Sequence, residues 1–383
     1  QIIFASVSYR RVVADLRLTK IMNWDEEKVM NELAAIQFMA YTKYDNYDQF
    51  IPGTRFLGSL AQWLYQFEES ERETMYNFVK EKLIFISSRQ MSYLITLLYK
   101  MLIMTTIAKK VAEDISIPQY YIRRIKSSKE FHQHKRMSLF VGLSDGAHMD
   151  IIRRTSELNN EQVLTNYFPD NNKIKDLIKA LKESSELNNI REDDRKFETL
   201  FLIDDFTASG SSFIRLDKKD GKYHGKLKKV IDKIFITTEK NKTNFRDIFK
   251  SDVSIQIFFC VATEYALNTI KTELNNYLAT LNLPNKFAIE VNCVQKIEDE
   301  IATELKNDKC LIDIIKKPQY FNPDVKDKPS FQNGKHDEAY LGYNEGALPI
   351  VLSHNTPNNS LPTLWQPSKD GQYQSLFPRI NRH

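Results

Sequence analysis

The sequence has little glycine and little cysteine. Glycine occurs 11 times in 383 residues, about 3% against a usual share near 7%, so we expect each glycine to stand where a side chain would not fit. The three cysteines, Cys260, Cys293 and Cys310, form no CxxC pair. This excludes a disulfide scaffold and a cysteine-based zinc site, and it indicates a reducing, cytoplasmic compartment.

Long apolar runs are also missing. The longest covers residues 95–108 and contains Lys100, whereas a membrane-spanning helix needs about 20 apolar residues. We therefore expect a buried helix here and no membrane partner. Lys and Arg number 54 against 50 Asp and Glu, a net charge of +4, which is too balanced to indicate a nucleic-acid-binding protein by composition.

Several motifs of common enzymes are absent. The chain has no P-loop, no GxGxxG and no HExxH, and the serines of residues 209–212 have no His partner in a recognisable hydrolase motif. His132 and His134 have no further metal ligands nearby in the sequence, which favours a surface loop over a metal site.

The first third of the chain is predicted to be helical. The segment 55–67 places Phe56, Leu60, Trp63 and Leu64 on one face at helical spacing, and the segments 25–33, 71–85 and 88–111 have the same character. The length predicts two or three domains. We expect an all-α N-terminal domain over residues 1–135.

From residue 136 to residue 383 the pattern changes to short apolar runs, each followed by a polar or helical stretch. Such runs are typical of strands buried on both faces, and their alternation with helices predicts an α/β domain with a parallel sheet and a C-terminal extension. The expected strands are residues 138–141, 199–203, 233–237, 254–262, 287–294 and 348–352. The expected helices are residues 147–157, 172–184, 212–216, 265–281 and 297–306.

The strongest local signal is TLFLIDDFTASGSSF, residues 199–213. An apolar strand would deliver Asp204 and Asp205 to the carboxyl edge of the sheet, where open α/β folds bind ligands. The small, hydroxyl-rich loop 207–212 would follow and lead into a helix, whose N-terminus favours a phosphate. The alternative is an ordinary strand–turn–helix with a solvated acidic pair.

A second loop lies about 60 residues earlier, in SLFVGLSDGAHMDIIRR, residues 138–154. An apolar strand runs into GLSDG and then into a helix, and two of the scarce glycines, Gly142 and Gly146, stand here. Alone, this stretch also fits a plain turn between a strand and a helix. Together with the acidic motif, it favours a ligand loop.

These segments resemble type I phosphoribosyltransferases. More broadly, FIPGTRFLGSLAQWLYQFEESER, GLSDGAHMDIIRR, LFLIDDFTASGSS, VATEYAL and HNTPNNSLPTLW resemble the phosphoribosyltransferase-like proteins of bacterial conflict systems, including retron-associated anti-phage loci. The resemblance covers most of the chain. It implies a type I phosphoribosyltransferase-like parallel sheet flanked by helices, preceded by a helical module, and a toxic or effector role.

The resemblance also implies roles for individual residues. Asp204 and Asp205 would be the catalytic, ribose-holding acids and, with Asp145, would help to hold Mg²⁺. The 5′-phosphate would bind Thr207, Ala208, Ser209, Gly210, Ser211 and Ser212. The pyrophosphate would bind Gly142, Ser144, Asp145, Gly146 and Arg153. The implied ligand is phosphoribosyl pyrophosphate or a related nucleotide, and the implied partner is a reverse transcriptase, its non-coding RNA or another defence-system component.

Two regions leave the function open. The interval between the two loops has no clear basic catalytic signature; Arg191, Arg195 and Lys196 fit a mobile loop or, more simply, a solvated charged run. The C-terminal segment 353–365 would place His354, Asn355 and Asn358 at the cleft, or else form a rigid structural turn. Two functions follow: an enzyme acting at the ribose C1′, or a catalytically silent module that senses a nucleotide and works through a partner.

Overall fold

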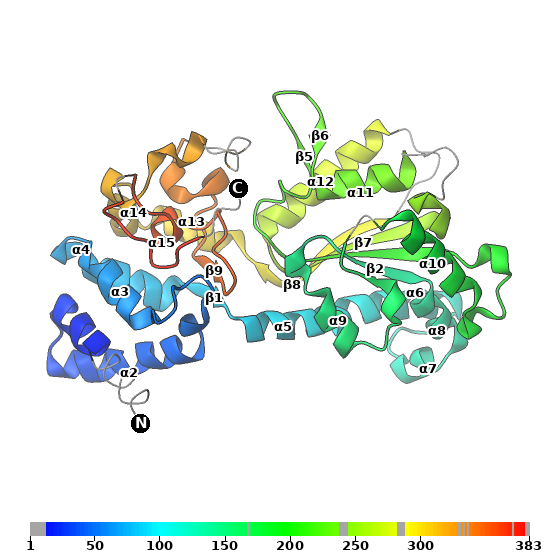
Figure 1. Ribbon diagram of the computed structural model, residues 1–383, viewed down its shortest axis with the longest axis horizontal. Helices are drawn as coiled ribbons and strands as arrows, with labels where there is room; N and C mark the ends of the chain where they lie inside the picture. Colours follow the sequence, from blue (N-terminus) through cyan, green and yellow to red (C-terminus); the bar gives the residue numbers. More distant parts are fainter. Residues whose placement is uncertain are drawn as a thin grey trace. The chain divides into compact units, whose positions relative to one another are not determined.

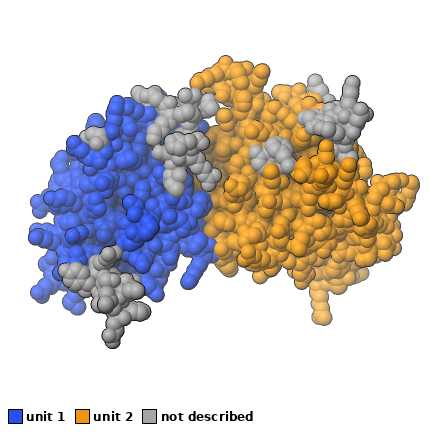
Figure 2. Space-filling view, viewed as in Figure 1, with its two compact units in different colours: residues 1–90, 298–383 blue, residues 91–297 orange. Residues whose placement is uncertain are grey.

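The computed structural model describes residues 13–166, 169–236, 244–281, 288–327, 331, 334, 337–369 and 371–379. The chain forms two compact units, coloured separately in Figure 2. Unit 1 comprises residues 1–90 and 298–383, and unit 2 comprises residues 91–297.

Unit 1 is built from both ends of the chain. Strand β1 (Ile84–Ile86) pairs in parallel with β9 (Ile350–Leu352), and the Trp63 indole N–H donates to the Thr363 carbonyl at 3.2 Å. The helices of this unit are α2 (Glu26–Thr42), α3 (Phe56–Tyr65), α4 (Glu69–Asn77), α13 (Asp299–Asn307), α14 (Lys309–Ile315) and α15 (Pro362–Trp365).

The C-terminal segment therefore completes the core of the N-terminal helices. Phe377, nearly at the end of the described chain, packs against the rings of Tyr44, Phe56 and Phe85. The two compact units therefore differ from a division of the chain at residue 135. Aromatic side chains near the C-terminus pack between the first helices and place both ends of the chain in unit 1.

Unit 2 begins within a long helix, three residues after the helix starts, and continues into the sheet. The helix Ser88–Asp114 consists of α5 (Ser88–Leu97), a π-helical turn over Leu98–Ile103 and α6 (Met104–Asp114). By length and apolar composition alone it could cross a membrane, and it is the one such helix among the described residues. Its π-helical turn packs against strands β7 and β8 of the sheet, where Leu98 and Ile103 are fully buried.

Five parallel strands form the sheet of unit 2, in the order β3-β2-β4-β7-β8. They are β2 (Ser138–Gly142), β3 (Val163–Leu164), β4 (Phe197–Thr207), β7 (Phe249–Thr263) and β8 (Ile289–Ile297). The chain order reverses between β2 and β4, and open α/β sheets bind ligands at the carboxyl ends of strands at such a switch point. The predicted fold class, a parallel sheet flanked by helices after a helical region, is confirmed.

Helices cover both faces of this sheet (Figure 1). On one face lie α10 (Asn171–Lys182), α11 (Lys226–Phe235) and α12 (Glu264–Thr280), whose apolar side chains share a core with alternate residues of β2, β4 and β7. On β4 those residues are Phe197, Leu200 and Leu202. The opposite face carries Phe140 and Phe201, whose rings stack at 5.0 Å. The remaining helices of the unit are α7 (Ile122–Lys126), α8 (Lys129–Arg136) and α9 (Met149–Thr155).

Some sequence predictions are wrong. Residues 233–235, expected in a strand, belong to α11, whose buried Leu227, Val230 and Ile231 follow helical spacing; Thr237 lies outside the described residues. Residues 212–216, expected as a helix, form a turn followed by β5 (Arg215–Leu216). The strand at 350–352 pairs only with β1 among the described strands, not with the large sheet.

A buried ionic cluster ties the amino end of the sheet together. Glu198, 5% exposed, accepts a hydrogen bond from the His134 ring on α8 and pairs with Lys110 (3.2 Å) and Lys250 (3.0 Å). His134 is thus a buried core residue and not part of a surface loop. Burial would raise the pKa of Glu198, but the hydrogen bond and charge of His134, with both lysines, lower it to about 2.

Replacing the Glu198 carboxylate tests how much this cluster contributes to the free energy of unfolding. Glu198→Gln should lower the free energy of unfolding at pH 7 by about 3 kcal/mol, because Lys110, Lys250 and the His134 ring lose their buried carboxylate partner. A carboxyl group with a depressed folded pKa stabilises above its unfolded pKa and loses that effect as the pH falls. Parent stability should therefore fall between pH 4.5 and pH 2 more steeply than that of the variant.

Urea unfolding at several pH values measures both effects. Glu192→Gln, at a side chain 63% exposed, is the control and should change stability by less than about 0.5 kcal/mol. Equal stability of the parent and the Glu198 variant would show that the cluster contributes nothing.

Candidate functional site

Asp204 and Asp205 lie at the carboxyl end of β4, next to the loop that follows β2. Strands β2 and β4 are neighbours and parallel, with Gly142 opposite Ile203, so both chain segments leave the sheet at the same edge. The two residues are 1% and 8% exposed, respectively. The sheet therefore brings together the two motifs that are about 60 residues apart in the sequence, at its switch point.

The Asp204 carboxylate is contacted by a hydroxyl on one side and an ammonium on the other. Its Oδ1 accepts a hydrogen bond from the Ser144 hydroxyl, and its Oδ2 lies 2.8 Å from the Lys226 ammonium. Asp204 has the same strand parity as Leu200 and Leu202, which explains why it faces α11, where Lys226 stands. Lys226 was not among the predicted site residues.

Asp205 is buried differently. Its carboxyl group lies against Gly146, where a Cβ would approach Oδ2 to 2.7 Å, and its Oδ1 accepts the Phe206 N–H at 2.9 Å. Burial, together with the charge of Asp204 and a hydrogen bond to it, raises the pKa of Asp205 to about 7. The scarce glycine at position 146 is therefore required by the close approach of the acidic pair.

The serine-rich loop after β4 is tightly held. Thr263 donates its hydroxyl to the Ala208 carbonyl at 2.7 Å, and the hydroxyls of Ser209 and Ser211 lie 2.9 Å apart. Gly210 has φ +74°, and a Cβ there would lie 2.9 Å from Ile270 of α12. Helix packing as well as backbone conformation thus demands glycine at this position.

The same loop presents polar groups in graded exposure. Thr207 is buried, Ser209 and Ser211 are half-buried, and Ser212 is exposed. The loop therefore has hydroxyl groups at its open side while its carbonyl groups are partly used within the fold.

A hairpin separates this loop from the next helix. Strands β5 and β6 (Tyr223–His224) pair antiparallel, and only then does α11 begin, at Lys226. The helix nevertheless returns to the loop, because the Lys226 N–H donates to the Ser212 carbonyl at 3.1 Å and the Leu227 N–H to Phe213 at 2.9 Å. The predicted juxtaposition of loop and helix N-terminus is made across an inserted hairpin and not by direct continuation.

The loop after β2 is short and strained. Gly142 packs against Met149, where a Cβ would lie 2.7 Å from Cγ, and Asp145 is exposed. His148, at the start of α9, has φ 45° and ψ 48°, a left-handed conformation that costs about 1–2 kcal/mol for a residue with a Cβ. Strain of this kind is concentrated at ligand-binding loops, and no sequence signal identified this residue.

Two of the basic candidates, Arg153 and Arg195, donate hydrogen bonds to backbone carbonyls elsewhere in unit 2. Arg153 donates to the Val163 carbonyl of β3 at 3.0 Å. Arg195 donates to the Ile190 carbonyl at 3.0 Å and to the Lys182 carbonyl at the end of α10. Arg191 is exposed. Arg195 thus closes the C-terminus of a helix, and the assignment of Arg153 to pyrophosphate stays a prediction.

The C-terminal candidates belong to unit 1. The His354 carbonyl accepts from the Gln49 side chain at 2.7 Å, and the Asn358 carbonyl accepts from the Tyr343 N–H at 2.7 Å. Asn355 Oδ1 accepts from the Thr356 N–H at 3.0 Å. Since these bonds anchor the segment within unit 1, a role for the three side chains at the acidic pair stays a prediction.

The donor set at the acidic pair fits a hard divalent cation. Asp204, Asp205 and the Ser144 hydroxyl offer oxygen atoms only, which are the ligands that Mg²⁺ prefers. Asp145, on the same loop as Ser144, adds an exposed carboxylate that could act through water. Burial raises the pKa of the Cys260 thiol, and the nearby charges of the acidic pair raise it further. A raised thiol pKa disfavours the thiolate that metals bind, so the ligands at this site are oxygen atoms.

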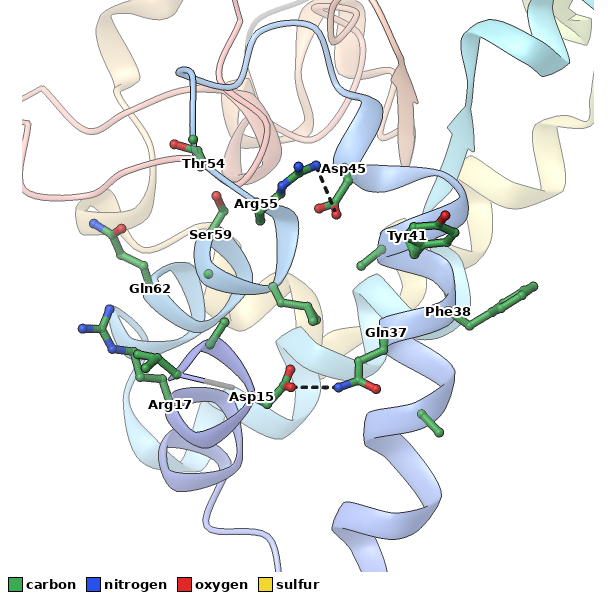
Figure 3. A pocket seen from close by; sticks show the side chains of 17 residues that line it. Asp15, Arg17, Gln37, Phe38, Tyr41, Asp45, Thr54, Arg55, Ser59 and Gln62 are labelled. Atoms are coloured by element: carbon green, nitrogen blue, oxygen red, sulfur yellow. Dashed lines mark hydrogen bonds and ion pairs between the residues drawn. The ribbon is translucent and has the colours of Figure 1, made fainter. Parts of the chain in front are cut away.

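A cavity of about 780 Å³ lies in unit 1, between the helical segment that contains residues 13–17, α2, α3 and the segment that joins α2 to α3 (Figure 3). The Asp15 carboxylate accepts from Gln37 at 2.9 Å, and Arg55 pairs with Asp45 at 3.7 Å. Figure 3 shows Phe38 projecting away from these groups. The cavity combines charged, amide and aromatic side chains, but it has no acidic doublet with a serine-lined loop.

Fold and site together define a phosphoribosyltransferase-like protein. A family model described as PRTase-CE matches residues 60–379, and the chain belongs to this family. No curated protein and no solved structure matches the chain. The match begins within α3 and ends near Phe377, so it covers all of unit 2 and the parts of unit 1 that lie within residues 60–379.

The raised pKa of Asp205 makes a prediction about stability. An acid whose folded pKa lies above its unfolded value destabilises the fold increasingly as the pH rises from about 4 to about 7. Asp205→Asn should therefore raise the free energy of unfolding at pH 8, by about 1–3 kcal/mol, and should raise it less at pH 5.

Denaturant unfolding of parent and variant at both pH values measures this difference. The exposed Asp252 supplies the control, Asp252→Asn, for which we expect the same small effect at both pH values. A variant of Asp205 that is less stable than the parent at pH 8 would contradict the assignment.

Proposed function

We propose that unit 2 binds phosphoribosyl pyrophosphate or a related nucleotide together with Mg²⁺ and acts at the ribose C1′. The observation that carries this proposal is the position of the acidic pair. Asp204 and Asp205 stand at the switch point of the sheet, between the loop 142–146 and the serine-lined loop 207–212. That arrangement offers carboxylates for a sugar diol between two loops suited to phosphates.

Each part of the ligand has a matching part of the site. The hydroxyls of Ser209, Ser211 and Ser212 face the 5′-phosphate, and the N-terminus of α11 returns to the same loop with its partial positive charge. The acidic pair accepts hydrogen bonds from the ribose hydroxyls. The loop from Gly142 through Asp145 to Gly146 holds the pyrophosphate.

Catalysis in this site is mainly positioning. An acceptor attacks C1′ while the bond to pyrophosphate breaks, and fixed positive charge stabilises the departing oxygens. When bound, Mg²⁺ supplies part of that charge. The chain itself holds the sugar and shields the reacting carbon, since the acidic pair is almost fully buried.

We further propose that the protein is a cytoplasmic effector of a bacterial anti-phage system. The support is the likeness of its motifs to defence-associated phosphoribosyltransferase-like proteins, which include a helical part before the phosphoribosyltransferase-like part. A reverse transcriptase, its non-coding RNA or another component of the same locus is the proposed partner.

A silent nucleotide-sensing module is the second candidate. Two observations favour it. The Asp204 carboxylate is already bound by Ser144 and Lys226, and the basic residue Arg195, between the two loops, donates its hydrogen bonds to carbonyl groups at and beyond the end of α10. A ligand would then reorganise the site without turnover and signal through unit 1 or a partner.

Binding and turnover are separable experimentally. Calorimetry with phosphoribosyl pyrophosphate and Mg²⁺ should show binding, which the double variant Asp204→Asn with Asp205→Asn should weaken by at least about 100-fold, because both ribose-holding acids are lost. The exposed neighbours Asp193 and Asp194 supply the matched control pair, whose conversion to Asn should leave affinity unchanged. Release of pyrophosphate across a panel of acceptors then distinguishes the enzyme from the sensor.

A second variant avoids the buried pair. Ser212→Glu adds a negative charge at an exposed position of the serine-lined loop and should weaken binding at least about 10-fold by repelling the phosphate, with no loss of thermal stability. Ser251→Glu, also at an exposed serine, should change nothing. Parent-like affinity in both the double variant and Ser212→Glu would rule out this site.

A further inference from the structure

Lys226 forms an ion pair with Asp204 of the acidic pair. Its ammonium lies 2.8 Å from Asp204 Oδ2, and its side chain is 28% exposed where that of Asp204 is 2% exposed. The lysine therefore spans from solvent to the buried carboxylate. Its charge stands where a cation bound by Asp204 would have to stand.

The backbone of Lys226 is fixed on the serine-lined loop. Its N–H donates to the Ser212 carbonyl. The preceding Gly225 has φ +122° and packs so closely on the Phe213 backbone that a Cβ would overlap it. These contacts hold the main chain at this point, so we expect any movement of the ammonium to come from rotation of the side chain.

The Lys226 side chain also contacts an aromatic ring along which it can rotate. The ammonium lies 4.8 Å from the centre of the Phe213 ring, a favourable cation–π distance, and Phe213 directly follows the serine-lined loop. A lysine has a flexible four-carbon stem with three rotatable donors. From a backbone that touches Ser212, it can reach either the Asp204 carboxylate or a phosphate bound on residues 208–212.

We propose that Lys226 is a built-in counter-ion that occupies the divalent-cation position at Asp204 and moves to the ligand phosphate when that cation binds. This proposal rests on the proposed function of the same site. It explains how two adjacent carboxylates stay buried without ligand. It also makes cation binding and phosphate binding favour each other. A cation at Asp204 releases the Lys226 ammonium for the phosphate, and a bound phosphate draws the ammonium away from the cation position at Asp204.

The first test measures Mn²⁺ binding by electron paramagnetic resonance with no phosphate present. Lys226→Met removes the competing charge and should raise Mn²⁺ affinity about 10-fold or more, within the usual range of coupling between sites. Lys226→Arg keeps the charge and should bind Mn²⁺ as weakly as the parent. Lys229→Met, at an exposed lysine of the same helix, is the matched control and should behave as the parent.

The second test measures inorganic phosphate binding by calorimetry with no divalent cation present. Phosphate affinity should fall about 10-fold in Lys226→Met and stay unchanged in Lys229→Met. A lysine that only supports the fold would lower both affinities, or neither, and either result overturns the proposal. If Lys226→Met does not fold, Lys226→Gln, which can still donate a hydrogen bond to Asp204, replaces it in both tests.

One further variant separates this proposal from the proposed function. Asp204→Asn placed in the Lys226→Met background should abolish Mn²⁺ binding. If it does so but Lys226→Met binds Mn²⁺ no better than the parent, the acidic pair is a metal site and the counter-ion role is wrong. If Asp204→Asn leaves Mn²⁺ binding unchanged, the metal site itself is wrong, and the counter-ion role with it.

Discussion

The constraint on which the site depends is the burial of two adjacent carboxyl groups at the edge of a parallel sheet. Without compensation, such burial would be prohibitive. The fold provides three forms of compensation: a hydrogen bond between the two acids, a hydroxyl from Ser144 and an ammonium from Lys226. Each comes from a different segment, so the loop after β2, the end of β4 and the start of α11 must be folded together before the pair can exist.

The two ends of β4 show why burial of charge alone does not indicate function. Glu198 near its start contacts one imidazole and two ammonium groups, and its pKa is lowered, as in a saturated structural cluster. Asp205 near its end shares its surroundings with another acid, and its pKa is raised. The positive groups around Glu198 stabilise its buried charge, whereas the uncompensated negative charge at the open edge of the sheet is consistent with the cation and sugar phosphate that we propose to bind there.

Much of this site could be predicted from the sequence because its parts are local. The strand, the acidic pair and the serine-lined loop occur within about 15 residues, and the scarcity of glycine drew attention to Gly146 and Gly210, both of which proved to be sites of close packing. Lys226 could not be found in this way, since a hairpin separates it from the loop it contacts. The grouping of Phe377 with Phe56 was likewise hidden, because no local pattern reports contacts between the two ends of a chain.

A crystal structure with ribose 5-phosphate and Mn²⁺ tests the central claim most directly. We expect the phosphate on the backbone and hydroxyls of residues 208–212, the sugar hydroxyls against the acidic pair, an anomalous manganese peak beside Asp204 and the Lys226 ammonium turned to the phosphate. A ligand found instead in the cavity of unit 1, or an acidic pair still closed by Lys226 with sugar phosphate bound elsewhere, would contradict the account.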